Sequence, residues 1–149
     1  MSWFSVHGTT GAAITLATGD YVLGGSIAFV SHFVWDYVGE SGLKDRFHAV
    51  IIEASCFAMF LVGAYLTGHF WLASFGYIMG CMPDLIDKPR DFIFGKGQWF
   101  SCHNGPGLFQ WKGKKLGYPV KYPLDDIQTA VLNYAVSIIW LGLAIVSVL

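Results

Sequence analysis

Long apolar runs, separated by short polar or glycine-containing stretches, make up most of this sequence. The dipeptides Gly19-Asp20 and Thr67-Gly68 are typical of tight turns. Pro83 disfavours helical geometry in the residue before it, so we expect a helix to end there. The pattern therefore predicts a single all-α domain over residues 1–149, a bundle of about five helices at residues 7–18, 21–38, 47–66, 69–82 and 125–148.

The predicted helices contain few charged residues. The chain is 54% hydrophobic and 13% charged, whereas soluble domains are about 25% charged. The last run, residues 125–148, is long enough to cross a bilayer, but residues 7–18 reach only about 18 Å and cannot cross the roughly 30 Å core. We expect an integral membrane bundle surrounded by lipids, with a short first helix. The net charge of −1 gives no electrostatic basis for binding nucleic acid.

All nine Lys and Arg residues fall on one side of this up-and-down arrangement. By the positive-inside rule, the N-terminus and both basic loops are cytoplasmic and the C-terminus lies on the far side. The second basic stretch, residues 83–124, is polar, aromatic and long for a connection in a compact domain, which is typical of a functional loop. The nine residues are Lys44, Arg46, Lys88, Arg90, Lys96, Lys112, Lys114, Lys115 and Lys121.

A polar pair lies inside the apolar run 21–38. His32 and Asp36 are four residues apart, so they share one face of a helix. Ionisable groups inside a membrane are costly, which makes a functional site the default hypothesis for them. The structural alternative is a hydrogen bond between His32 and Asp36 across one helical turn.

Counting from the two predicted turns places further ionisable residues at a similar depth. His7 and His32 each lie about 12 residues from the Gly19-Asp20 turn, and Asp36 and Asp84 lie about one helical turn nearer the cytoplasm. Glu53 falls between these levels. If the helices are regular and upright, all of these groups fall within about 6 Å of one another in depth.

Neutral imidazoles and carboxylates are the ligands of zinc, manganese and iron, and two such ions with a bridging water form a hydrolytic centre. Asp84 and Asp87 follow Pro83, where a proline turn can aim both carboxylates at the bundle end. His103 belongs to a Gly/Pro-containing segment that could close over the same mouth. We predict one or two divalent transition-metal ions, zinc or manganese, with Glu53 and His103 as catalytic candidates and Glu53 as the general base. The predicted ligands are His7, His32, Asp36, Asp84 and Asp87.

Structural alternatives stay open at several of these positions. His7 can cap the first helix, and Asp84 can cap a turn, because Pro-Asp is common at helix starts. Glu53 can be a buried protonated acid or the ion-pair partner of Lys44 or Arg46.

Three short motifs carry a resemblance to a known family: the HG at His7, SHFVWD around His32 and Asp36, and PDLID at Asp84. They resemble the small bacterial inner-membrane proteins classed as metal-dependent hydrolases, over about residues 7–40 and 80–90. The resemblance implies an inner-membrane location and a metal site at the five ligand positions. The chain departs from the family pattern at Val38-Gly39-Glu40, where many relatives have Pro-His, and at Lys88, where some have His, which leaves a single ion open.

Two functions of different classes follow. The first is a membrane-embedded metal-dependent hydrolase that acts on a phosphoester or related bond of a lipid or membrane-bound substrate, whose anionic head group the 83–124 loop would bind. The alternative is a non-catalytic membrane subunit whose 83–124 loop docks a partner protein and whose polar cluster is structural. A proton or ion pathway is less favoured, because a conduit needs polar residues at successive depths.

Overall fold

The computed structural model of this protein describes residues 4–38, 46–94, 109–111, 114–116 and 126–146. It contains the helices α1 (Phe4–Thr18), α2 (Tyr21–Val38), α3 (Arg46–Leu66), α4 (Phe70–Phe94) and α5 (Asp126–Val146). The strands β1 (Phe109–Trp111) and β2 (Lys114–Leu116) pair in antiparallel register. The predicted bundle of five helices is therefore confirmed, and the small β-ribbon between α4 and α5 was not predicted.

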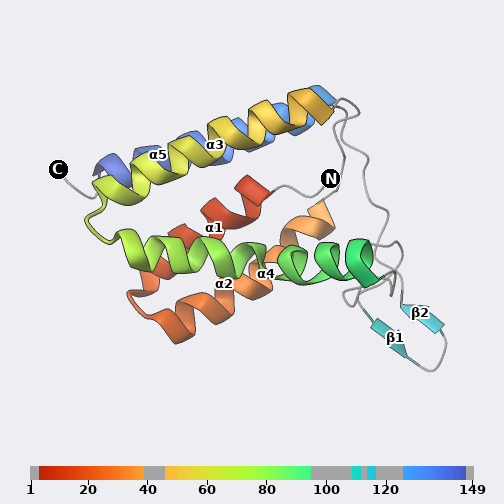
Figure 1. The fold of residues 1–149 in the computed structure, drawn as a ribbon. Coiled ribbons are helices and arrows are strands. Elements are labelled where there is room, and N and C mark those ends of the chain that lie inside the picture. The colour runs from red at the N-terminus through yellow and green to blue at the C-terminus, as the bar shows by residue number, and fades with distance from the viewer. Residues whose placement is uncertain (1–3, 39–45, 95–108, 112–113, 117–125, 147–149) are drawn as a thin grey trace.

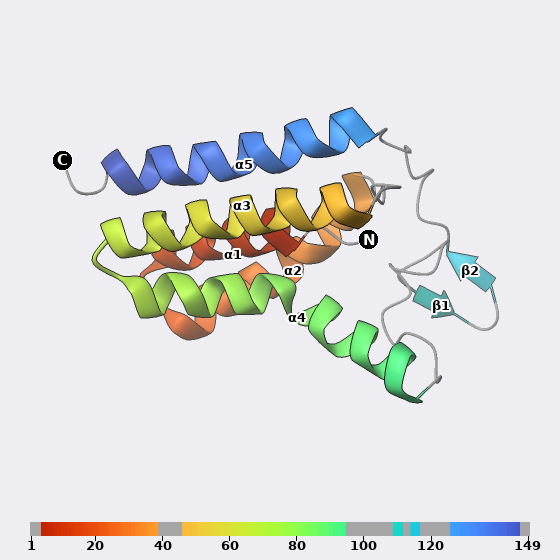
Figure 2. The ribbon, with the colours of Figure 1, turned by 45° about the horizontal axis from the view of Figure 1, so that its top comes forward.

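Helix α1 lies in the middle of the bundle and contacts all four other helices (Figure 1). On one side of it lie α2 and α4. On the other side α3 and α5 pack against each other, as a second view also shows (Figure 2). Successive helices run in opposite directions, so α1, α3 and α5 begin at the end of the bundle where α2 and α4 finish.

Both predicted tight turns are confirmed. Gly19 and Gly68 have φ angles of 65° and 69°, in the left-handed region that glycine adopts at little cost. The Gly19 N–H closes α1 by donating to the carbonyl of Thr15 at 3.0 Å. Asp20 then caps α2, because its Oδ1 accepts the Leu23 N–H at 2.7 Å. These two turns fix the antiparallel pairing of α1 with α2 and of α3 with α4.

Glycines allow α1 and α4 to pack with their backbones in contact. A Cβ added to Gly11 would lie 2.3 Å from the carbonyl oxygen of Gly76, and one added to Gly80 would lie 2.2 Å from the carbonyl oxygen of His7. Any side chain at these positions would push the helices apart. The separation of α1 and α4 is therefore set by backbone contact.

The prediction that the fourth helix ends before Pro83 is wrong. Helix α4 continues through Pro83 and Pro89 to Phe94 and bends midway (Figure 2). A proline inside a helix lacks an N–H and its ring crowds the carbonyl four residues earlier, so it bends the helix. Neighbouring helices can satisfy the backbone carbonyls that such a bend frees, which lets the helix continue.

Helix α1 begins at Phe4, three residues before the predicted start at residue 7. The other helix boundaries agree with the prediction to within a few residues. Most of the predicted 83–124 loop, including His103, lies outside the described residues.

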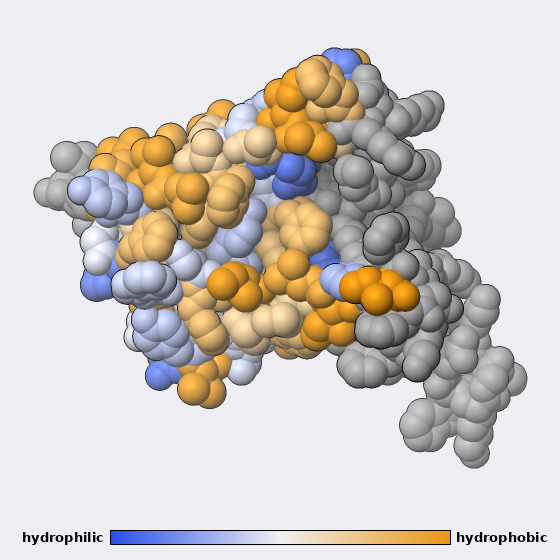
Figure 3. Space-filling view, in the orientation of Figure 1, coloured by the Kyte–Doolittle hydropathy of each residue, from blue (hydrophilic) through white to orange (hydrophobic). Residues whose placement is uncertain are grey.

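Large apolar side chains are exposed on α2, α3, α4 and α5, and Figure 3 shows apolar residues among polar ones on one face of the bundle. Among the described helices, Phe47–Leu66 is long and apolar enough to cross a membrane, and Ala130–Val146 is a shorter apolar helix. The most exposed large apolar residues, each at least 70% exposed, are Val22, Phe47, Tyr65, Trp71, Ile127 and Val146.

Candidate metal centre

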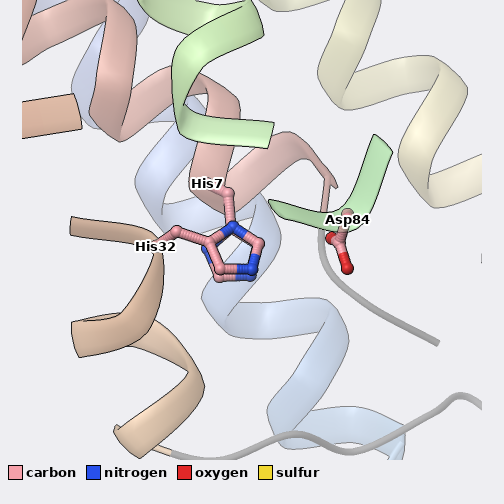
Figure 4. Close-up of side chains that lie close together, drawn as sticks. All are labelled: His7, His32 and Asp84. Atoms are coloured by element: carbon pink, nitrogen blue, oxygen red, sulfur yellow. The ribbon is translucent and has the colours of Figure 1, made fainter. Parts of the chain in front are cut away.

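Three helices bring ionisable side chains together inside the bundle. His7 of α1, His32 of α2 and Asp84 of α4 each offer a ligand atom, and these atoms all lie within 4.8 Å of one another (Figure 4). None of the three side chains is more than 2% exposed. Groups so far from solvent need partners of opposite charge or a metal.

Asp36 contacts both imidazoles of this group. Its Oδ1 lies 3.3 Å from His7 Nε2, and its Oδ2 lies 3.3 Å from His32 Nε2. The two imidazole rings are stacked, with their centroids 3.9 Å apart and their planes 23° from parallel. The centre thus combines two imidazoles with two buried carboxylates, Asp36 and Asp84, and we call these four residues the His/Asp cluster.

A backbone carbonyl sets the orientation of His32. The His32 Nδ1 lies 2.8 Å from the carbonyl oxygen of Gly80. A carbonyl only accepts, so Nδ1 carries the proton and donates it, and in the neutral ring Nε2 then holds a lone pair. That lone pair faces Asp36 Oδ2, a second acceptor. Two acceptors this close repel each other unless a proton or a metal cation lies against both.

The Gly80 carbonyl lies beside the bend at Pro83. Pro83 lacks the N–H that would bond to the Met79 carbonyl, and its ring crowds that carbonyl, so the helix bends in the turn that contains Gly80. Hydrogen bonds from the second nitrogen of a ligating histidine to a carbonyl are the usual device that fixes its tautomer and ring plane. Pro83 is therefore part of the local structure that aims His32.

The two distances from the imidazoles to Asp36 fit neighbouring ligands of a tetrahedral cation. Two ligand atoms that each lie about 2.1 Å from a tetrahedral ion are about 3.4 Å apart, and both imidazole–Asp36 distances are 3.3 Å. In addition, His7 Nδ1 is buried and has no hydrogen-bond partner among the described residues. Two neutral imidazoles and two carboxylates also match the charge of one divalent ion.

Asp87 lies three residues after Asp84 on α4, so the two share a face of the helix. Both are buried. The expectation that a proline turn carries these carboxylates is wrong, because both lie in the continuous helix α4 beyond the bend.

Glu53 hydrogen-bonds to Ser5 of α1. Its Oε2 accepts the backbone N–H of Ser5 at 3.0 Å and the Ser5 hydroxyl at 2.7 Å. The Ser5 hydroxyl also lies 3.0 Å from Asn133 Oδ1 of α5. Sequence reasoning missed Ser5, Asn133 and the Gly80 carbonyl, because none belongs to a motif or to a run of ionisable residues.

The other end of the bundle holds a cavity of about 350 Å³, far along α1 from His7. Its walls are mostly apolar, and they include Ala13, Leu16 and Trp140. The Trp140 Nε1–H donates to the carbonyl of Phe60 at 3.3 Å. Among its described lining residues, His69 is the one that carries an ionisable side chain.

Searches of this chain against protein-family models, curated proteins and solved structures gave no match. The functional interpretation therefore depends on the residues of the chain itself.

Proposed function

We propose that this protein is a membrane-embedded metal-dependent hydrolase that binds one divalent transition-metal ion, zinc or manganese, at the His/Asp cluster. Its substrate is a phosphoester or related bond of a lipid or membrane-bound molecule. The observation that carries the proposal is the convergence of buried side chains from three helices: the ligand atoms of His7, His32 and Asp84 lie within 4.8 Å of one another, and Asp36 lies 3.3 Å from both imidazoles.

The membrane location is supported by the apolar outer faces of the helices and by the position of the basic residues. Arg46 begins α3, Lys88 and Arg90 lie in the last part of α4, and Lys114 and Lys115 lie on β2. All of these fall at one end of the bundle (Figures 1 and 2). We assign this end to the cytoplasm and the five helices to a bacterial inner membrane.

A bound divalent ion would polarise a substrate oxygen and activate a water molecule. His7 and His32 hold the site, and Asp36 and Asp84 neutralise the charge of the ion. The water oxygen bonds to phosphorus while the bond from phosphorus to the leaving oxygen breaks. Asp87, predicted as a ligand, lies one turn beyond Asp84 and is not one of the three grouped ligand residues, so we assign to it the proton of that water, which it passes to the leaving oxygen.

The same contacts also fit a non-catalytic membrane subunit, in which hydrogen bonds join the imidazoles to Asp36 and no metal binds. The 3.3 Å distances suit this alternative as well, so the two functions differ in metal content rather than in fold.

The deciding experiment is elemental analysis of the protein purified in detergent, together with the Asp36→Ala and Asp36→Asn variants. A metal site predicts about one equivalent of zinc or manganese in the wild type, near-complete loss in Asp36→Ala and a milder loss in Asp36→Asn, with the fold retained in both.

A structural pair predicts a different order. Asp36→Asn would then melt like the wild type, whereas Asp36→Ala would leave a buried imidazole unpaired and cost about 1–3 kcal/mol. Early melting of Asp36→Ala, with no metal in the wild type even after zinc and manganese supplementation, would contradict the proposal.

Hydrolysis itself is tested on vesicles that contain phosphatidic acid, with p-nitrophenyl phosphate as a soluble probe. We expect phosphate release that a chelator abolishes, that added metal restores and that Asp36→Ala lacks. If the metal-loaded protein cleaves neither probe, the hydrolase assignment loses these substrate classes while the metal site stands.

A further inference from the structure

The N-terminal end of α1 is held from the side of the bundle opposite the His/Asp cluster. Glu53 Oε2 of α3 accepts both the N–H and the hydroxyl of Ser5, at 3.0 and 2.7 Å. Ser5 is fully buried. One carboxylate oxygen thus fixes the second residue of α1 through two hydrogen bonds.

The backbone of α1 has a specific need for this carboxylate. The first N–H groups of a helix have no partner within the helix, and the helix dipole favours negative charge at that end. Glu53 supplies both an acceptor and a negative charge from another helix. It therefore acts as a cap of α1 that comes from α3.

Asn133 adds a contact from α5. The Ser5 hydroxyl has one proton, which it donates to Glu53, yet it also lies 3.0 Å from the side-chain Oδ1 of Asn133. Because an amide oxygen and nitrogen exchange places by a simple flip, the consistent arrangement turns the Asn133 N–H₂ group towards Ser5 as donor. Helices α3 and α5 then both hold the start of α1.

His7 follows Ser5 by two residues, which is about 3 Å along the helix axis and about 200° around it. Ser5 therefore faces α3 and α5 while His7 faces α2 and α4. Backbone contact at Gly11 and Gly80 already fixes the separation of α1 and α4.

Along its axis, α1 is held towards α2 by Trp35, whose Nε1–H donates to the Thr10 hydroxyl at 2.9 Å, and towards α4 by Cys81, which donates to the Phe4 carbonyl at 3.2 Å. The Ser5–Glu53 hydrogen bonds add an axial anchor from α3, and any axial shift of α1 would move His7 relative to His32 and Asp84.

We infer that Glu53 is a positioning residue of the metal site, one that sets the depth of His7 by anchoring Ser5, and not the general base of the reaction. This inference rests on the proposed metal site. It also assigns the α3/α5 pair, which contributes no side chain to the His/Asp cluster, a role in assembling that cluster.

The experiment is a competition titration of the detergent-purified protein with zinc and a chromophoric chelator. It compares the wild type with Glu53→Gln, Glu53→Ala and Ser5→Ala. The matched control is Ser55→Ala, which removes a hydroxyl that links α3 to Tyr134 of α5 at 3.0 Å and is not bonded to α1 in the described structure.

We expect Glu53→Ala to weaken zinc binding about 10- to 100-fold, the range found when partners of metal ligands are removed. Glu53→Gln should stay within about 3-fold of the wild type, because its amide oxygen still accepts both Ser5 hydrogen bonds. Ser5→Ala keeps the backbone N–H and should fall between them. The control should bind zinc like the wild type.

A general base that holds no metal would leave zinc affinity unchanged in both Glu53 variants, and that result would overturn the inference. If Glu53→Ala does not fold, equal affinity of Ser5→Ala and the wild type would have the same consequence. A wild type that binds neither zinc nor manganese would overturn the proposed function itself, and the inference with it. If the wild type binds zinc and Glu53→Ala binds it with the same affinity, the inference is overturned while the proposed function stands.

Discussion

The two sides of the bundle are held together by different means. Between α1 and α4, glycines bring the backbones into contact, and a Cβ at Gly11 would lie 2.3 Å from the Gly76 carbonyl oxygen. Between α3 and α5, large side chains do the packing, as where Trp140 lies against Phe60 with ring centroids 5.9 Å apart. The first contact allows almost no adjustment, whereas the second is built from side chains that can repack.

The chemistry follows the same division. Every buried imidazole and carboxylate among the described residues lies on α1, α2 or α4. The buried polar residues of α5 are Asn133 and Ser137, which are uncharged. The proposed metal site needs fixed distances, and its candidate ligands lie on the side with backbone contact. The α3/α5 pair then serves as a support.

Removal of a ligand from the rigid side should have the largest effect. His32→Ala takes away an imidazole that no neighbour can replace, and we expect zinc affinity to fall more than about 100-fold, beyond the loss from removing a partner of a ligand. The control is His48→Ala, which removes an exposed imidazole of α3. Chelator competition measures both variants, and equal losses would show that zinc binds histidine nonspecifically.

Removal of the bend in α4 should have the second-largest effect on zinc affinity. Pro83→Ala restores an N–H that can bond within the helix, which should straighten α4 and draw the Gly80 carbonyl away from His32. We expect zinc binding to weaken about 10-fold. Pro89→Ala is the matched control, because Pro89 lies beyond the cluster and is exposed. The role of the bend would be refuted if both proline variants bound zinc like the wild type.

Glycine substitutions compare the packing of the two sides directly. Gly11→Ala forces a methyl group against the Gly76 carbonyl and should destabilise the protein by about 1–3 kcal/mol. Gly142→Ala on α5 meets nothing within 4 Å, and it should be neutral or stabilise by up to about 1 kcal/mol. Thermal melting in detergent gives both values. Similar losses in the two variants would contradict the contrast between the sides.

The smallest effect is expected within the α3/α5 pair. Trp140→Phe keeps a ring against Phe60 but removes the Nε1–H that donates to the Phe60 carbonyl at 3.3 Å. The expected cost is about 1 kcal/mol of unfolding free energy, with unchanged zinc affinity. A change in zinc affinity would show that this packing reaches the metal site.

Much of the fold could be predicted from the sequence, because apolar runs and turn residues act locally. The turns at Gly19 and Gly68 can be predicted from the sequence, because few residues other than glycine readily adopt their positive φ angles. The continuation of α4 through Pro83 could not be predicted in this way. It depends on neighbouring helices, one of which provides His32 as a donor to the Gly80 carbonyl.

The sequence predicts the level of each candidate site residue along the bundle axis, but it does not predict which helix face the residue contacts. Helical rise gives the level of each residue, and it places Glu53 near His7. It does not say which face of α1 each neighbouring helix contacts. In the structure Glu53 meets Ser5, about 200° around α1 from His7. Which side of a helix a neighbour covers is decided by tertiary packing, so the partner of Glu53 could not be identified from the sequence.

The most direct test of the metal centre is zinc K-edge X-ray absorption of the wild-type protein loaded with one equivalent of zinc and then desalted. The His/Asp cluster predicts retained zinc with two imidazole nitrogens at about 2.0–2.1 Å and oxygen ligands at about 2.0–2.2 Å. Zinc that is lost on desalting, or that is retained without imidazole scattering, would contradict a metal centre at His7 and His32.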